Sequence, residues 1–275
     1  MPWVIQFNLK ITSKYLLDLS NFLSLTYKKI MRSLLFVSSL LFPIISFSQG
    51  METDRPDQTE ASSTVEKKRL QIESGVLIEF VDKGEINSRS ILLPTTLIRL
   101  GVSDHFELRI LSQYENNEVF KAKNHGISDL ELGTKIQLYQ KENARFEMAF
   151  LSHLRIPTGT KSVRNENIGT LNKLCFSNKI NDNFSIGYNL GYNYEGNNNG
   201  DGTYSMALNY SLSEKVAVYA EPYGEITNFE RLMANFDSGF TYLLHENLQF
   251  DFSFGLGLNH DMNYLSFGLS WKSKE

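Results

Sequence analysis

The chain of 275 residues contains a single cysteine, Cys175, and this scarcity limits its chemistry. One cysteine cannot form an intrachain disulfide, and it cannot build a zinc site from thiolates. Cys175 stands at a polar position of an alternating segment with no catalytic motif around it, so we interpret it as a small structural residue. We expect neither a cofactor nor a metal site.

The sequence also lacks an apolar stretch long enough for a transmembrane helix. The longest such stretch, residues 34–47, is interrupted by Pro43. It follows a basic segment, and small residues stand at its end. This order is typical of a cleaved export signal, so we predict a signal-peptide region over residues 1–48, with Met31 as the expected start of translation. A retained membrane anchor is the alternative.

Catalytic signatures are missing as well. No zinc-protease, esterase or phosphate-loop motif is present. Ser152 and His153 are adjacent, and neighbours on a strand point to opposite faces, so they cannot act together as nucleophile and base without a bulge. Residues 197–202 are rich in asparagine and glycine but lack the spacing of a calcium loop. We therefore expect no enzymatic activity.

The charge balance argues against nucleic acid as a partner. Removing residues 1–48 takes away five basic residues and one acid, which lowers the net charge from −4 to −8. An acidic exported protein has little affinity for a phosphate backbone.

What the sequence has is strict alternation of apolar and polar residues. Between residues 247 and 259, for example, one face carries Leu248, Phe250, Phe252, Phe254, Leu256 and Leu258. A period of two predicts β-strands. About twelve such segments, each near the roughly ten residues that span a membrane, follow one another. They are residues 69–81, 90–102, 105–114, 127–140, 145–156, 170–180, 183–194, 203–213, 216–226, 235–245, 247–259 and 262–272.

The links between these segments alternate in length. Tight polar links stand at 103–105, 140–144, 181–183, 213–215 and 245–247, and longer ones at 82–88, 115–126, 157–169, 195–202 and 227–235. Outer-membrane barrels have short periplasmic turns and long external loops. We predict an all-β fold, a transmembrane up-and-down antiparallel β-barrel of about 12 strands over residues 69–275, preceded by a polar N-terminal arm, residues 49–68. A soluble sandwich is the alternative.

The start of the arm resembles a known family. Its residues Thr53-Asp54-Arg55-Pro56, then Thr64-Val65 and Gln71-Ile72-Glu73-Ser74-Gly75, are similar to the opening of the mature region in the family labelled the putative MetA-pathway of phenol degradation, and "RIPTG" at 155–159 is similar too. The resemblance implies an outer-membrane β-barrel of Gram-negative bacteria, of the "transporter" type, involved in the passage of small organic compounds.

Charged residues on the inferred inward face separate into two arcs. The basic ones are Arg99, Arg109, Lys135, Arg155, Lys173 and Lys179, and the acidic ones are Glu221, Glu225, Asp237 and Asp251, with Tyr219 and Tyr223 between them. The arcs predict either a field across an open pore or a lumen neutralised locally by Glu107, Asp129, Glu131 and Glu147; we favour the second. We expect the arm, with its motif Asp54, Arg55 and Pro56, to fold into the periplasmic end; a free tail is the alternative.

The function predicted from these patterns is passive passage or binding of small organic molecules, in a porin-like manner, in the outer membrane of a Gram-negative bacterium. A structural or assembly barrel with a blocked lumen and a lipid-modifying enzyme are the alternatives. The expected partners are outer-membrane lipid, a small-molecule solute of aromatic or other type, and the barrel-assembly machinery during insertion.

Overall fold

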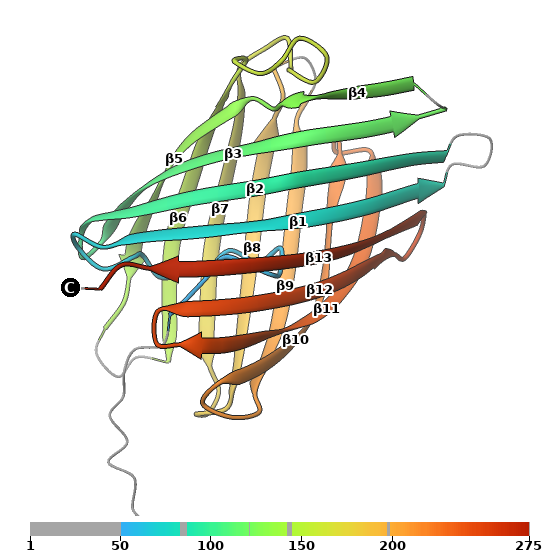
Figure 1. Cartoon of the computed structure of the whole chain (residues 1–275). Helices are drawn as coiled ribbons and strands as arrows, with labels where there is room; N and C mark the ends of the chain where they lie inside the picture. The colour runs from blue at the N-terminus through green and yellow to red at the C-terminus, as the bar shows by residue number, and fades with distance from the viewer. Residues whose placement is uncertain (1–50, 83–86, 121, 142–144, 197–198, 275) are drawn as a thin grey trace, which may run out of the picture. The chain divides into compact units, whose positions relative to one another are not determined.

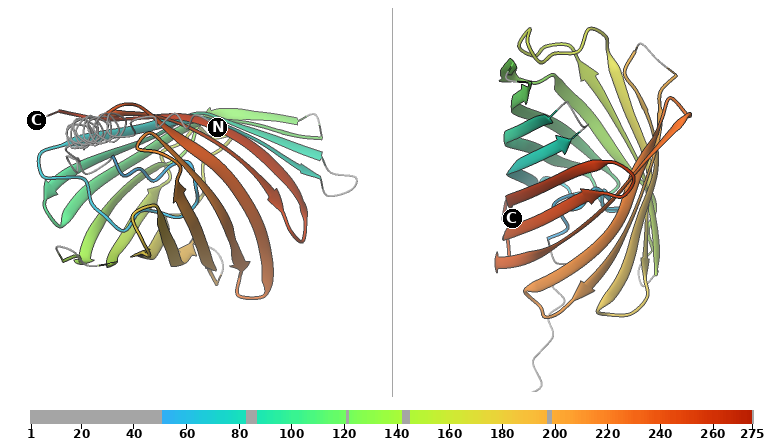
Figure 2. Two further views of the ribbon diagram at one scale, coloured as in Figure 1. Left: turned by 90° about the horizontal axis from the view of Figure 1, so that it is seen from below. Right: turned by 90° about the vertical axis from the view of Figure 1, so that its right-hand side faces the viewer.

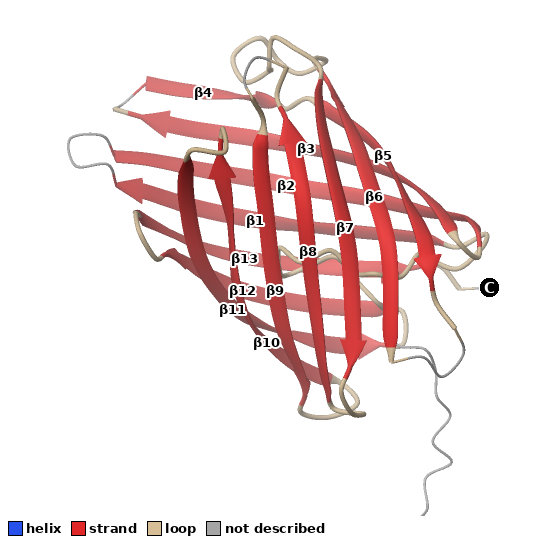
Figure 3. Ribbon diagram, turned by 180° about the vertical axis from the view of Figure 1, so that it is seen from behind, coloured by secondary structure: helices blue, strands red, loops and turns tan. Residues whose placement is uncertain are grey.

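The computed structural model describes residues 51–82, 87–120, 122–141, 145–196 and 199–274. The predicted signal-peptide region, residues 1–48, lies outside them. Among the described residues, no helix is long and apolar enough to cross a membrane. All regular elements in this part of the chain are strands (Figures 1 and 3).

The described residues form thirteen strands, which agree closely with the alternating segments of the sequence. They are β1 (Leu70–Asp82), β2 (Asn87–Ser103), β3 (Phe106–Val119), β4 (Ala122–Ile127), β5 (Leu130–Tyr139), β6 (Phe146–Ile156), β7 (Gly169–Lys179), β8 (Phe184–Tyr194), β9 (Asp201–Ser211), β10 (Val216–Thr227), β11 (Arg231–His245), β12 (Leu248–Gly257) and β13 (Asp261–Lys272).

Twelve of these strands close into a ring. Each pairs antiparallel with its neighbours in the chain, except that β3 pairs with β5, and β1 pairs with β13 along its whole length and so closes the barrel. The predicted up-and-down antiparallel barrel is therefore confirmed. The remaining strand, β4, pairs with the far end of β3 and forms a hairpin with it (Figure 1).

The two faces of the wall are inverted relative to a soluble protein. Along β13 the exposed residues are Leu265, Phe267, Leu269 and Trp271, whereas the residues between them that are polar, such as Ser266 and Ser270, are buried. Burying polar groups and exposing apolar ones is favourable only where lipid surrounds the outside. The outer face is thus a lipid-facing surface, and the protein is an outer-membrane β-barrel.

The two ends of the barrel differ in their connections. The tight links, together with the start of β1 and the end of β13, lie at one end, which we call the turn end; Gln71 pairs there with Lys272. The opposite end we call the loop end. Its links are shorter than the sequence suggested, because strands extend into them. The link expected at 227–235 contains only residues 228–230, since Arg231 already pairs with Thr227.

Candidate functional site: a lumen occupied by the N-terminal arm

The described part of the arm, residues 51–68, lies inside the ring. Its side chains and backbone contact strands on opposite sides of the barrel, including β2, β3, β5, β9, β10, β12 and β13. A short segment can reach all of these strands of a closed ring only from the interior. Figures 1 and 2 draw this segment in blue, surrounded by the wall.

Asp54 joins the arm to the wall through ion pairs with three cations. Its carboxylate lies 3.2 Å from Arg99 Nη1, 2.6 Å from Arg109 Nη1 and 2.9 Å from Lys135 Nζ. The three cations project from β2, β3 and β5 and are almost completely buried. Burial alone would raise the pKa of Asp54, but the three cations hold it well below its ordinary value. The carboxylate also accepts a hydrogen bond from the backbone N–H of Ala61, which folds the arm back on itself.

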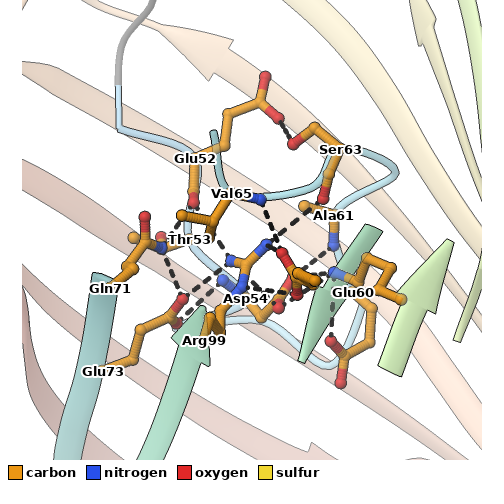
Figure 4. Close-up of polar contacts among 12 residues, drawn as sticks. Glu52, Thr53, Asp54, Glu60, Ala61, Ser63, Val65, Gln71, Glu73 and Arg99 are labelled. Carbon is orange, nitrogen blue, oxygen red and sulfur yellow. Dashed lines mark hydrogen bonds and ion pairs between the residues drawn. The ribbon is translucent and has the colours of Figure 1, made fainter. Parts of the chain in front are cut away.

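Carboxylates of the wall complete this cluster. Glu73 of β1 pairs with Arg99 at 3.0 Å and accepts the backbone N–H of Asp54. Glu107 of β3 pairs with both arginines and accepts the backbone N–H of Val65. Figure 4 shows Arg99 between the arm and these strands. Every buried charge here has an opposite partner, as burial requires.

Arg55 makes the matching contact with the opposite arc. Its Nη2 donates to Asp251 of β12 at 3.0 Å and to Ser266 of β13 at 2.9 Å. The guanidinium lies against Gly75 and Gly268, where the Cβ of any larger residue would collide with it. The wall is therefore shaped to receive this side chain. We call Asp54 and Arg55, with their wall partners, the anchor.

We call the next residues of the arm, Asp57–Glu60, the constriction segment. Its first three residues contact the other side of the lumen, whereas the carboxylate of Glu60 lies 2.8 Å from Arg109 Nη2 and 3.7 Å from Lys135 Nζ. Thr59 Oγ1 donates to Glu221 of β10 at 2.5 Å and lies 2.7 Å from Ser205 Oγ of β9. The backbone N–H of Gln58 donates to the same glutamate at 2.7 Å. These contacts are hydrogen bonds, with Glu221 as the acceptor in two of them.

Asp57 meets charges of its own sign. Burial, and then the charges of Glu221 and Asp237, raise the pKa of Asp57 well above its ordinary value. Asp237 accepts the Tyr264 hydroxyl at 2.5 Å through one oxygen, while its other oxygen is buried without a hydrogen-bond partner among the described residues. The hydroxyl of Tyr219 is likewise buried and unpartnered.

Two cavities lie along β7 to β11, and the outer one also reaches β1 and β13. The inner cavity, of about 280 Å³, is on the turn-end side and is lined by the arm together with Ser177, Asn209, Val218 and Thr241. The outer cavity, of about 480 Å³, is on the loop-end side and is lined by Leu171, Tyr204, Tyr223, Met233 and Tyr264 among others. The constriction segment contributes to the lining of both: Asp57, Thr59 and Glu60 to the inner, and Gln58 to the outer.

The other candidate residues of the sequence analysis lie away from the anchor. Arg155 is partly exposed and pairs with Glu131 and Glu195. Lys173, Tyr223 and Glu225 line the outer cavity. Lys179 is half-exposed and pairs with Asp182 in a turn, so it takes no part in the buried cluster.

The four carboxylates expected to neutralise the basic arc divide into two kinds. Glu107 and Glu131 do pair with basic residues of the wall. Asp129 instead accepts the backbone N–H groups of Gly159 and Asn165, and Glu147 accepts hydrogen bonds from Ser62 and Gln140.

Several important residues were absent from the candidates. They are Thr59, Glu60, Glu73, His153 and Tyr264. The last three stand on inward positions of strands and could have been found by the same parity argument. The two arm residues gave no periodic signal. No group of three or more acidic, histidine or cysteine side chains among the described residues is arranged to hold a metal ion.

Comparison with known proteins gives a family and a fold. A family model described as "Putative MetA-pathway of phenol degradation" matches residues 53–270. No curated protein sequence matches the chain. The fold is similar to that of an outer-membrane channel from Pseudomonas putida F1, with 10% identity, a TM-score of 0.66, and coverage of 81% of this chain and 100% of that one. It is also similar to the KdgM porin bound to disordered oligogalacturonate, with 12% identity, a TM-score of 0.51, and coverage of 74% and 99%.

Proposed function

The chain belongs to the family described as "Putative MetA-pathway of phenol degradation", and we propose that it is a narrow outer-membrane channel for passive passage of small organic molecules, with its own arm restricting the lumen. One observation carries this proposal: two cavities follow each other inside a closed, lipid-facing barrel and are separated by a segment of the arm. A wall that encloses water-accessible space from near one end to near the other is what a solute pathway needs.

The lining of the outer cavity supports an organic solute. Tyr204, Tyr223 and Tyr264 offer aromatic surface, and Met233 and Met262 offer adaptable apolar surface. Asn235 is 9% exposed, lines the cavity and has an amide oxygen without a partner among the described residues. A molecule with an apolar body and a polar group fits these features. The family description names phenol, which belongs to this class.

We propose no catalytic function. His153 has both ring nitrogens engaged, since Arg109 donates to Nε2 at 2.9 Å and Nδ1 lies 3.1 Å from Glu131. Ser152 instead donates to Asn172 of the neighbouring strand at 2.8 Å. The pair therefore has separate partners on separate faces, which argues against a lipid-modifying enzyme.

A structural barrel with a blocked lumen is the second candidate. The completely paired charges of the anchor favour it, because a buried ion-paired cluster is costly to open. The two candidates differ in transport, not in fold.

We further propose that the turn end faces the periplasm, that outer-membrane lipid contacts the exposed apolar belt, and that the barrel-assembly machinery inserts the chain. Single cysteines in a Cys175→Ala background test the orientation. A cysteine replacing Asn199 at the loop end should react with an impermeant maleimide on intact cells. One replacing Asp182 at the turn end should react only after the outer membrane is permeabilised, and the reverse pattern would contradict the orientation.

Solute uptake into liposomes tests the channel itself. Purified protein in liposomes should accelerate the entry of small aromatic alcohols and sugars relative to protein-free liposomes, and it should give single-channel currents in planar bilayers. Absence of both, with a barrel that still migrates as folded on unheated gels, would favour the structural candidate.

A further inference from the structure

The lumen has a packed side and an open side. On the packed side the anchor joins the arm to β1, β2, β3, β5, β12 and β13 through buried ion pairs and hydrogen bonds. On the open side both cavities lie along β7 to β11, and the outer one also reaches the loop-end halves of β1 and β13. A solute that crosses the barrel therefore meets space on one side and a filled cluster on the other.

The constriction segment lies between the two cavities, because its residues line both of them. Thr59 and Gln58 contact Ser205 and Glu221, and Glu60 lies 3.9 Å from Lys173 Nζ, the only cation among the residues lining the outer cavity. The contacts to Ser205 and Glu221 are three hydrogen bonds, and a hydrogen bond contributes less net stability than is lost when a buried ion pair is broken. Displacing Asp57, Gln58 and Thr59 would join the cavities without disturbing the ion pairs of the anchor, while Glu60 stays paired with Arg109 at 2.8 Å.

The titratable side chains around Asp57, in the constriction segment, are acidic. Asp57 of the arm, Glu221 of β10 and Asp237 of β11 gather there, with the unpartnered hydroxyl of Tyr219 beside them. The free oxygen of Asp237 is fully buried and points to no donor among the described residues. When these carboxyls are ionised, the ring attracts cations and repels anions, as acidic rings do in cation-selective pores.

We propose that the solute path runs along β7 to β11, that the constriction segment is its moving part and selectivity filter while the anchor stays in place, and that passage favours cations over anions. This inference rests on the channel function proposed above. It assigns the selectivity to Glu221 and Asp237 rather than to the buried arginines of β2 and β3. It also limits the movement that opens the lumen to residues 57–59 of the constriction segment, because Glu60 is held by Arg109.

Two cross-links in a Cys175→Ala background test which part moves. Thr59→Cys with Ser205→Cys places thiols where the two hydroxyls are 2.7 Å apart, so a disulfide should lock the constriction segment to β9. Glu66→Cys with Lys272→Cys, whose native side chains are 2.8 Å apart and line neither cavity, is joined by a short bismaleimide and locks the arm to β13 at the turn end. Each single-cysteine variant serves as the control, and heat-modifiable migration on gels verifies folding.

The first lock should abolish single-channel current and restore it on reduction, while the second should leave the current unchanged. Loss of current with the second lock would overturn the proposal, because the whole arm would then have to move. Unchanged current with the first lock would overturn it too, because the path would lie elsewhere. No current from the unlocked protein would instead refute the channel function itself.

Reversal potentials across a potassium chloride gradient test the filter. The wild-type sign should indicate preference for potassium, and Glu221→Gln should shift the potential toward zero. Glu118→Gln, which removes the same charge from the β3–β4 hairpin where Glu118 pairs with Arg89, is the matched control and should leave the potential unchanged. Preference for chloride, or equal shifts in the two variants, would overturn the assignment.

Discussion

The arm meets the two sides of the lumen in opposite ways. At the anchor, Asp54 contacts three cations and Arg55 contacts an acid, so each buried charge faces its opposite. At the constriction segment, Asp57 faces Glu221 and Asp237, so like charges meet. Removing one partner of a buried ion pair costs about 3–5 kcal/mol, whereas one hydrogen bond contributes about 0.5–1.5 kcal/mol when both groups are neutral and about 1.5–3 kcal/mol when one is charged. One continuous arm thus has a fixed half and a weakly held half.

Deleting residues 51–66 should break both halves and have the largest effect. The two cavities would merge with the space that the arm occupies, so single-channel conductance should rise several-fold. The hydrogen-bonded ring of strands does not depend on the arm, so the barrel should still resist heat in detergent. Conductance measurements with gel mobility check this, and unchanged conductance in a folded barrel would mean that another element blocks the lumen.

Asp54→Asn should break only the anchor. The substitution keeps the shape of the side chain but leaves Arg99, Arg109 and Lys135 short of one buried negative charge, at a cost of about 3–5 kcal/mol. We expect a lower unfolding temperature and a noisier, larger current. Differential scanning calorimetry and bilayer recordings measure the two effects. Glu60→Gln is the comparison, because Glu60 is more exposed, and its loss should have the smaller effect.

A change in pH should affect the stability of the anchor and of the constriction segment in opposite directions. The raised pKa of Asp57 means that the seated segment prefers the protonated acid; this contribution is complete below the ordinary value of 3.8 and is lost as the pH rises through the raised pKa. The lowered pKa of Asp54 means that the anchor gains stability above 3.8 and loses it only in stronger acid. The groups that act on Asp57 are Glu221, Asp237, Tyr219 and Asp54.

Current should therefore increase as the pH rises above about 4 while the anchor remains intact. Asp57→Asn removes the titrating group and should flatten this profile and lower the current at neutral pH. Recordings at stepped pH values with both proteins provide the measurement. A wild-type current that falls with rising pH would show that the like charges do not weaken the segment.

Lys179→Ala should have the smallest effect of all. Lys179 is half-exposed, and its partner Asp182 is 86% exposed, so solvent screens the pair. We expect conductance, ion preference and heat resistance to match the wild type. A change in ion preference would mean that the turn-end rim also acts as a filter, and the contrast between anchor and constriction would then explain less of the selectivity.

The wall was predictable from the sequence because its constraint is local. Alternation assigns each strand residue to one face, and lipid on the outside requires the apolar residues to lie there. Arg99, Lys135, Asp237 and Asp251 follow from this parity alone. The β4 strand was predicted as part of the long link at 115–126, because its residues, Ala122–Ile127, show no alternation of apolar and polar side chains.

The contents of the lumen were only partly predictable. The sequence of the arm contains both acidic and basic residues, and its resemblance to the family singled out Asp54 and Arg55. Which wall residue each one meets depends on how the ring brings distant strands together, and Arg55 with Asp251 spans 196 positions in the chain. Thr59 is an ordinary residue in sequence terms and gains its importance only from lying between two cavities.

The attachment of the arm at the turn end has a consequence for assembly. Lys68 and Arg69 lead from the arm into β1 beside the end of β13, and Lys272 there pairs with Glu66 at 2.8 Å. The arm can therefore enter the finished ring from that end, without any strand having to pass another. Ring closure and plugging become separable steps, so a barrel caught between them would be fully closed, fully hydrogen-bonded and briefly unobstructed.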